Sequence, residues 1–291
     1  MSDTAASLRH KIASAGDLAS VVRTMKAMAA SSISKYENAV RSLDDYDRAV
    51  QLGLRACFRQ SQPVSAWRPQ GRAEAPVGAV VFGSDQGMVG QFNDLLGDFV
   101  LETLGNMPGK KLIWTIGERM QVRLDGSALG VGGNFSLPSS IGAITALIGQ
   151  ILLAVENQRE HGEITQLHIF HNRPMSGAIY QPVVQRLLPL DEGWRQEISS
   201  RPWPSNNLPE VIAGGATLRA FVREYLFVSL FRACAESLAS ENASRLAAMQ
   251  RAEKNIGELL EDLDNDFHRL RQSAIDEELF DVISGYEAHE G

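Results

Sequence analysis

The segment from Gly83 to Gly90 is the stretch of this sequence whose residue types could bind a phosphate group. It follows a short apolar run, Val77–Phe82, and precedes a helical pattern that begins at Gln91, so it would lie at a helix N-terminus, where anions bind. Its glycines at positions 83, 87 and 90 do not have the spacing of the dinucleotide fingerprint, and no Lys-Ser or Lys-Thr pair follows them. The pattern favours a plain strand-to-helix turn, and a small enzyme that binds a phosphorylated ligand here remains an alternative.

Two histidines and a Ser-Asp pair are the other side chains that could act in catalysis or hold a metal. His168 and His171 are three residues apart in a predicted strand, which directs them to opposite faces of a sheet, and no cysteine or acidic cluster joins them. Ser84 and Asp85 have no evident histidine partner to serve as a base. We therefore predict no catalytic residue, no metal site and no cofactor.

Composition narrows the classes of function. The formal charge of the 291 residues is −7 at pH 7, which argues against a nucleic-acid partner. We find no apolar run long enough to span a bilayer, and the start, Met1–Thr4, lacks the basic and apolar blocks of a signal peptide. Cys57 and Cys234 lie in helical patterns far apart in the sequence, and we interpret them as small buried residues of a reducing compartment.

Between residues 77 and 190 the hydrophobic pattern alternates between strand and helix. Short apolar runs predict buried strands at residues 77–82, 111–116, 167–170 and 183–188. Helical patterns separate them at residues 91–104 and 139–156, with a short helix after Gly117. Strands that alternate with helices form a mostly parallel sheet, so we predict an α/β domain with flanking helices over 77–190. Proline-containing linkers flank this domain on both sides.

A long apolar seam characterises the C-terminal end. No proline interrupts the sequence from Ala216 to Ser284, and apolar residues recur there at the three- and four-residue steps of a coiled coil. The seam consists of Met249, Ile256, Leu260, Leu263, Phe267, Leu270 and Ala274. So narrow a stripe requires one partner helix rather than a surrounding core. We predict a coiled-coil helix over residues 210–288.

The partner helix is predicted at the other end of the chain, over residues 1–59. Apolar residues from Leu8 to Cys57 keep nearly the same rhythm, and 50 helical residues would reach about 75 Å. Two such ends predict a long antiparallel two-helix coiled coil. Gly16 predicts a bend or a close helix-helix approach. The segment from Lys26 to Ser34 consists almost entirely of small residues. These are either simply good helix formers on a thin two-helix seam, or they allow a surrounding protein to enclose the helix closely.

Several blocks of the sequence resemble the gamma subunit of F-type ATP synthases. They are Lys11–Ser14, Val21–Ala30, Ser84–Asn93, Leu187–Pro189, Ser237–Met249, Asn255, Gly257–Leu259 and Arg269–Ile275. The blocks follow the family order and spacing over essentially the whole chain. Departures from the usual family residues stand at Gln86, Val89, Asp276 and Tyr286. They indicate a divergent branch, such as an alternate, sodium-linked bacterial form, and leave the coupling ion, a proton or sodium, open.

The resemblance implies a central rotor shaft that couples ion-driven rotation of a membrane ring to ATP synthesis or hydrolysis. In this family the terminal helices form a coiled coil inside a ring of alpha and beta subunits, and the α/β domain sits as a foot on the c-subunit ring beside the epsilon subunit. ATP is made or split on the beta subunit, so we expect a non-catalytic subunit. We also expect a peripheral position on the cytoplasmic side of the cell inner membrane, reached only through the complex.

The resemblance also implies which residues contact the alpha/beta ring. Carried over by matched position, they are Met25, Lys26, Arg245, Arg271, Gln272 and Glu278. In the predicted seam Phe267, Leu270 and Ala274 face the partner helix, so Arg271 and Gln272 project outward. A free-standing coiled-coil adaptor is the alternative of another class, and stability without partners would favour it.

Overall fold

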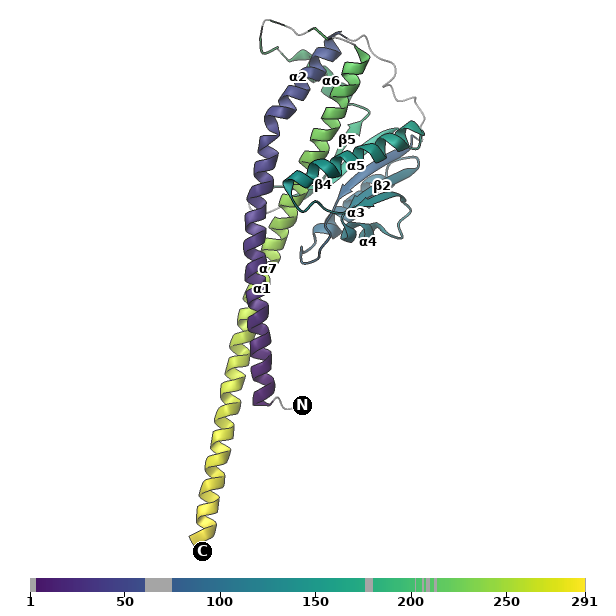
Figure 1. Cartoon of the computed structure of the whole chain (residues 1–291). Coiled ribbons are helices and arrows are strands. Elements are labelled where there is room, and N and C mark those ends of the chain that lie inside the picture. The colour runs from purple at the N-terminus through teal and green to yellow at the C-terminus, as the bar shows by residue number, and fades with distance from the viewer. Residues whose placement is uncertain are drawn as a thin grey trace. The chain divides into compact units, whose positions relative to one another are not determined.

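The computed structural model describes residues 4–60, 75–175, 180–201, 203–205, 207, 210–211 and 214–290. The chain divides into two compact units (Figure 1). One unit consists of the residues up to Ala29 together with those from Leu246 onward, and the other runs from Ala30 to Arg245. Two long helices, α1 (Ala5–Ser42) and α7 (Gly215–Glu290), contribute to both units.

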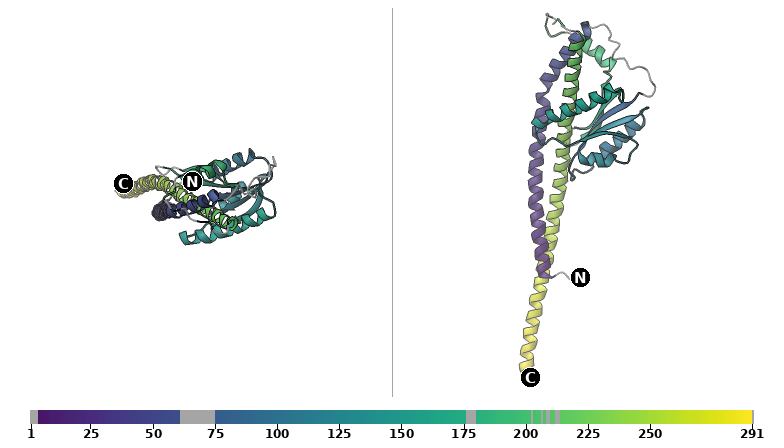
Figure 2. Two further views of the ribbon diagram at one scale, coloured as in Figure 1. Left: turned by 90° about the horizontal axis from the view of Figure 1, so that it is seen from above. Right: turned by 45° about the vertical axis from the view of Figure 1, so that its right-hand side comes forward.

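The first unit is an antiparallel pair of helices. Its central buried cluster consists of Ala15, Ala19 and Val22 of α1 and Met249 and Ile256 of α7. Glu253 pairs with Arg23, whereas Phe267, further along α7, lies under Arg9, earlier on α1. Pairing of later α7 residues with earlier α1 residues requires antiparallel helices, and Figure 2 shows them side by side. The predicted coiled coil of the chain ends is confirmed.

The second unit is built on a five-stranded sheet with the order β3-β2-β1-β4-β5. The strands are β1 (Val77–Phe82), β2 (Lys111–Ile116), β3 (Gly130–Phe135), β4 (Gln166–Pro174) and β5 (Tyr180–Leu188). The pairs β1–β2, β1–β4 and β2–β3 are parallel, and β4–β5 is antiparallel. The prediction of a mostly parallel sheet is confirmed.

Helices cover both faces of this sheet, which is why its central strand has no polar residue. Val77, Ala79 and Val81 of β1 pack in the core beneath α3 (Phe92–Gly105) and α4 (Glu118–Leu124). Val80 and Phe82 point to the other face, into a core that α5 (Ile141–Glu160), α2 (Asp44–Gln60) and α7 share. A strand buried on both faces is a continuous apolar run, as the sequence of β1 is.

The predicted single helix over residues 1–59 is two helices in the structure. The α-helical pattern stops at Ser42 and resumes at Asp44, with Leu43 in a turn between them. Three aspartates in the first turn of α2 favour a new helix start there, because carboxylates interact well with a helix N-terminus. Gly16, by contrast, lies inside a continuous α1, and no neighbouring atom lies within 4 Å of the position its Cβ would take. The predicted close approach at Gly16 is therefore wrong, whereas the bend stays a prediction.

Two elements escaped the sequence prediction. Strand β3 contains three glycines and little apolar character, and glycine 132 packs its backbone against the ring of Trp114. Helix α6 (Glu192–Ser200) is short and begins where Asp191 accepts a hydrogen bond from the N–H of Trp194 at 2.9 Å. Such a side-chain cap stabilises a short helix whose apolar periodicity is too brief to detect.

Helix α5 is, by length and apolar composition alone, long enough to cross a membrane. The expectation that no apolar run reaches that length is therefore wrong by this measure. Ile144, Ile148 and Ile151 of α5 are nevertheless fully buried in the core of the second unit. Packing in this core accounts for these residues of α5, whereas Leu153 on the same helix is exposed.

Candidate functional site

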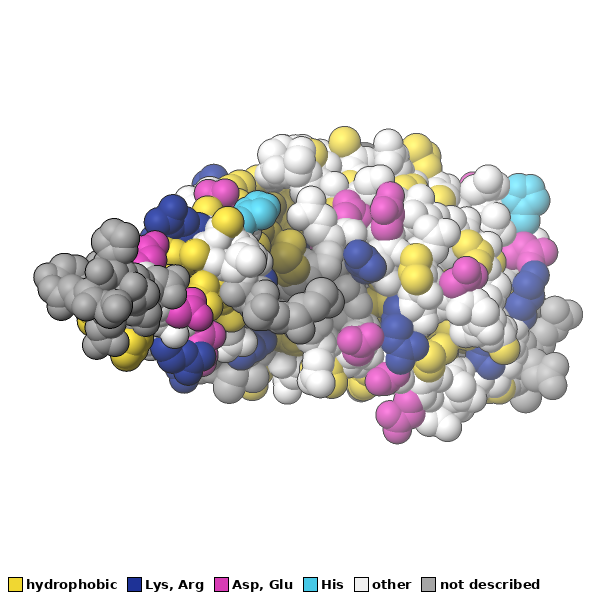
Figure 3. Space-filling model, turned by 90° about the horizontal axis from the view of Figure 1, so that it is seen from below, with side chains coloured by type: hydrophobic (Ala, Val, Ile, Leu, Met, Phe, Trp, Pro, Cys, Tyr) yellow, Lys and Arg dark blue, Asp and Glu magenta, His cyan; other side chains and the backbone are white. Residues whose placement is uncertain are grey.

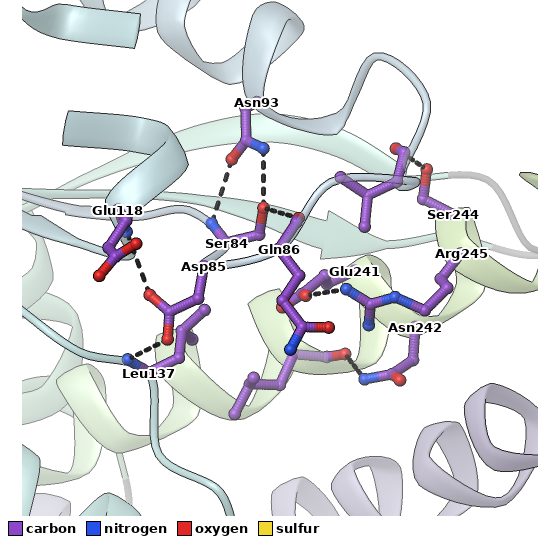
Figure 4. Close-up of polar contacts among 12 residues, drawn as sticks. Ser84, Asp85, Gln86, Asn93, Glu118, Leu137, Glu241, Asn242, Ser244 and Arg245 are labelled. Atoms are coloured by element: carbon purple, nitrogen blue, oxygen red, sulfur yellow. Dashed lines mark hydrogen bonds and ion pairs between the residues drawn. The ribbon is translucent and has the colours of Figure 1, made fainter. Parts of the chain in front are cut away.

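The loop after β1, residues 83–91, lies at the carboxyl end of the sheet and is closed by its own hydrogen bonds (Figure 4). Asn93 accepts from the N–H of Ser84 at 3.1 Å and donates to the Ser84 hydroxyl at 2.7 Å. That hydroxyl donates in turn to the carbonyl of Gln86 at 3.0 Å. Ser84 is fully buried and its proton is already donated, so it is not poised as a nucleophile.

Asp85 ties this loop to two other segments. One carboxylate oxygen accepts from the N–H of Glu118 at the start of α4, and the other accepts from the N–H of Leu137, each at 3.0 Å. The neighbouring Gly117 has a φ of 102°, and a Cβ there would lie 2.6 Å from the Ser84 backbone. A glycine is therefore required where α4 meets the loop. The acid that sequence analysis considered as a catalytic partner of Ser84 instead orders backbone.

Helix α7 covers the carboxyl ends of β1 and β4. Ser237 donates to the carbonyl of Phe82, the last residue of β1, and Ser240 donates to that of Asn172 near the end of β4, both at 2.9 Å. Open α/β sheets bind their ligands at this edge, between the strands where the direction of winding changes. In this sheet those strands are β1 and β4. From β1 the chain passes to β2 and β3 on one side of β1, and it then returns to β4 on the opposite side. The crevice is thus occupied by a helix of the same chain.

A buried histidine and a carboxylate form the most polar contact between the sheet and α7. His171 Nε2 lies 2.8 Å from the Glu236 carboxylate, which also accepts from Arg173 Nε at 3.1 Å. Burial lowers the pKa of His171, so the imidazole is neutral and donates to Glu236. Burial alone would raise the pKa of Glu236, but His171 and Arg173 together hold it below its usual range. With its side chain 2% exposed, His171 is positioned for packing rather than for proton transfer with a substrate.

Arg245 is turned toward its own helix. Its Nη2 lies 2.6 Å from the carboxylate of Glu241, and the two side chains are 13% and 7% exposed. Burial raises the pKa of Glu241, and the nearby charge of Arg245 limits that rise. Of the residues expected to contact a surrounding ring, Arg245 is the one that the structure nearly buries. Its contact with another subunit stays a prediction.

Met25 and Lys26 lie on the coil. Met25 is half-buried against the seam of the first unit, and the Lys26 ammonium pairs with the Glu253 carboxylate. Sequence analysis missed Glu253, although Arg23 and Lys26, three residues apart, present two cations on one side of α1. It also missed the serines of α7, whose common helix face is apparent from their spacing.

Arg271, Gln272 and Glu278 lie on the part of α7 that no longer packs against α1. Leu270 is half-buried, and every residue from Arg271 to Phe280 is exposed. Within the described part of the chain these three side chains make no hydrogen bond or ion pair, and Ile275, Leu279 and Phe280 beside them are exposed apolar residues. Arg271 and Gln272 are exposed as expected, but Ala274, which was predicted to face the partner helix, is exposed as well, so the predicted seam is wrong at Ala274. The partners of Arg271, Gln272 and Glu278 remain predictions.

Three further features bear on the kind of partner or ligand. On the face shown in Figure 3, acidic and basic side chains are interspersed, and neither sign forms a continuous patch among the described residues. No group of three or more His, Cys, Asp or Glu side chains among the described residues is arranged to hold a metal ion. Cys57 and Cys234 are buried free thiols, and burial raises the pKa of each.

Comparison with known proteins gives a consistent result over nearly the whole chain. The family model described as ATP synthase matches residues 4–288. The ATP synthase gamma chain of Glaesserella parasuis is 26% identical over 291 residues, which cover 96% of each chain.

Two solved structures share the fold. A chain of the rotor of the Euglena gracilis mitochondrial ATP synthase aligns with a TM-score of 0.60 at 15% identity, over 92% of this chain and 97% of that one. A chain of the OSCP/F1/c-ring structure from the same organism aligns with a TM-score of 0.61 at 15% identity, over 97% and 93%.

Proposed function

The chain belongs to the ATP synthase family, as its gamma chain, and from this premise we propose how the shaft of that rotary motor works here. The coil of the first unit turns inside a ring of alpha and beta subunits, and catalysis takes place on beta. The α/β domain rests on the c-subunit ring beside the epsilon subunit. The chain reaches the cytoplasmic face of the cell inner membrane only through these subunits, as a peripheral component without a cofactor of its own.

The observation that best supports this proposal is the unpaired end of α7. Every residue of α7 from Arg271 to Phe280 is exposed, including three large apolar side chains. This part of the helix buries too little surface to be stable alone in water. A surrounding ring would supply the missing contacts, and mixed charged and apolar residues on one stiff helix would present a different face to each of three identical subunits. An adaptor that functions alone would gain nothing from such an end.

A capture experiment tests the proposal. An affinity tag inserted at Gly126, where no atom lies within 4 Å of an added Cβ, leaves the coil and sheet untouched. Purification from native membranes should yield alpha, beta, epsilon and c subunits together with the tagged chain. Ile256→Asp is the matched control, because a charge in the buried seam should abolish recovery of alpha and beta. Recovery of the tagged chain alone would refute the proposed role.

The enzyme alternative is tested separately by calorimetry. The loop at residues 83–91 uses the Ser84 amide and the Asp85 carboxylate for internal bonds, so ATP, ADP and NAD should give no stoichiometric heat signal with the purified chain. A one-to-one signal at micromolar concentration would support a ligand-binding domain instead. That result would leave the capture experiment unaffected.

A further inference from the structure

Three serines on one face of α7 bond the helix to the carboxyl end of the sheet, where other open α/β sheets bind their ligands. Ser237, Ser240 and Ser244 are separated by three and four residues, so they lie on the same side of the helix and span about 10 Å of its length. Each donates to a backbone carbonyl of a different segment: Phe82 at the end of β1, Asn172 in β4 and Val89 in the loop between β1 and α3. Figure 4 shows the bond of Ser244.

The three serines that make these bonds are buried. Ser237 is 1% exposed, Ser240 is fully buried, and Ser244 is 8% exposed. In the antiparallel register Asn172 lies opposite Pro182, and the carbonyl of Asn172 accepts from the Ser240 hydroxyl. Tyr180 Oη, at the start of β5, lies 3.3 Å from the Ser244 hydroxyl. The helix is thereby bonded to β1, β4, the loop and β5.

Apolar packing holds α7 to the sheet, and directional hydrogen bonds restrict its angle further. Leu230, Ala233 and Leu238 bury side chains in the shared core and interdigitate there, but the hydrophobic effect itself has no preferred direction. A hydrogen bond weakens steeply when its angle changes. Three such bonds to three separate backbone segments, together with the contacts of Glu236 with His171 and Arg173, restrict both the rotation of α7 about its axis and its position along the sheet.

We propose that Ser237, Ser240 and Ser244 form a torsional latch, which fixes the angle of the α/β domain relative to the shaft helix and carries torque between them. The proposal rests on the proposed rotor function. These serines are positioning residues: they touch no nucleotide, and they act by resisting twist where a related sheet would bind a ligand.

The test measures torsional stiffness in the assembled complex. The alpha/beta ring is fixed to a surface, and a bead is attached to the α/β domain through Gln121→Cys, an exposed position on α4, while both native cysteines are buried. In the triple variant Ser237→Ala, Ser240→Ala, Ser244→Ala, the variance of the bead angle during the pause before ATP binds should at least double. The ATPase rate per ring should stay within about twofold, because the end of α7 is unchanged.

Asn242→Ala is the matched control, since Asn242 lies on the same turns of α7 but donates to Leu238 of its own helix. It should leave the angular variance unchanged. Equal variance in the triple variant and the unsubstituted complex would overturn the latch. If the triple variant does not assemble, Ser240→Ala alone is measured in the same way, and unchanged variance there overturns it equally. Failure of the unsubstituted chain to join the ring would refute the rotor function instead.

Discussion

The ammonium of Lys26 on α1 forms an ion pair with the carboxylate of Glu253 on α7, across 227 residues of sequence. Arg23 reaches the other oxygen of the same carboxylate at 3.2 Å. The hydrogen bond from Lys26, and then that from Arg23, hold the pKa of Glu253 below its usual range. The contact sets which turn of α1 lies beside which turn of α7, something that the small residues Ala15 and Ala19 of the seam specify poorly.

Neutralising Glu253 should therefore loosen the coil locally. In Glu253→Gln we expect amide hydrogen exchange to accelerate a fewfold in residues 18–29 and 246–258, with a smaller effect at high salt because exposed charges are screened. Glu258→Gln is the control: Glu258 pairs with Lys254 on its own helix and joins nothing across the seam. The same acceleration in both variants would mean that the cross-helix pair has no special role.

Protection from exchange should also fall along α7 in the isolated chain. Amides of the α/β domain should exchange slowly, and those of residues 1–30 and 245–285 rapidly, because the coil buries a thin seam and α7 is exposed from Arg271. Adding purified alpha and beta subunits should slow exchange in the coil, since binding to the folded state stabilises it. Uniform protection without partners would instead indicate a self-sufficient adaptor.

Elements with one strong periodic signal could be predicted from the sequence. The run at β1 is apolar throughout and that at β2 is apolar except for Lys111 and Thr115, because both faces of the sheet are covered, and their predicted bounds are those of the structure. β3 could not be found, since two of its three glycines, Gly132 and Gly133, lie against the Trp114 ring, which is a tertiary contact. The break at Leu43 was equally hard to predict, because the apolar periodicity continues across it. Only the acidic first turn of α2 indicates that a new helix begins there.

The candidate site divides in the same way. Exposed positions for Arg271 and Gln272 were expected from helical geometry, but the exposure of Ala274 in the predicted seam was not. The inward turn of Arg245 was not expected either, because it depends on Glu241 and on the burial of both by the α/β domain. The position of the loop at Ser84 between a strand and a helix could be recognised from the sequence. Only the folded chain shows that Asn93 bonds the Ser84 amide and that the Asp85 carboxylate bonds the Glu118 amide.

Removing one oxygen acceptor from Asp85 should destabilise the α/β domain. Its two carboxylate oxygens each accept a backbone N–H, whereas the amide in Asp85→Asn offers one oxygen. A hydrogen bond to a charged group is worth about 1.5–3 kcal/mol, so the free energy of unfolding in urea should fall by roughly that amount. Glu118→Gln, which keeps the backbone N–H that Asp85 binds, should change it little. Equal stability of Asp85→Asn and the unsubstituted chain would contradict the assigned role.

Acid should destabilise the protein through His168. Burial, with a smaller contribution from Arg186, lowers the pKa of this histidine from 6.5 to about 4. Its folded-state pKa lies below the unfolded one, so the stabilisation is complete above pH 6.5 and is lost as the pH falls toward 4. The loss is at most about 3 kcal/mol. His168→Gln should flatten urea unfolding free energies across this window, whereas the exposed His161→Gln should not. Parallel pH profiles for all three proteins would exclude His168 as the cause.

The last prediction concerns Arg271 and Gln272, which lie on the exposed end of α7 without a partner in the described chain. A guanidinium with five donors in a rigid fork suits a directional contact with a carboxylate or carbonyl of an enclosing beta subunit. Arg271→Ala with Gln272→Ala leaves the buried seam of Val22, Met249 and Ile256 intact, so the complex should assemble normally. Its ATPase rate at saturating ATP should nevertheless fall, because the lost contact couples the angle of the shaft to the conformation of beta.

The size of that effect follows from the strength of one charge-assisted hydrogen bond. Losing about 1.5–3 kcal/mol in the limiting step slows a reaction by roughly tenfold or more. The matched control is Arg269→Ala, since Arg269 is equally accessible but already pairs with Asp266 at 2.9 Å on its own helix. It should leave the rate within about twofold, because a surface pair of this kind contributes little. A normal rate in the assembled double variant would mean that Arg271 and Gln272 are solvated surface residues and that the shaft engages beta elsewhere.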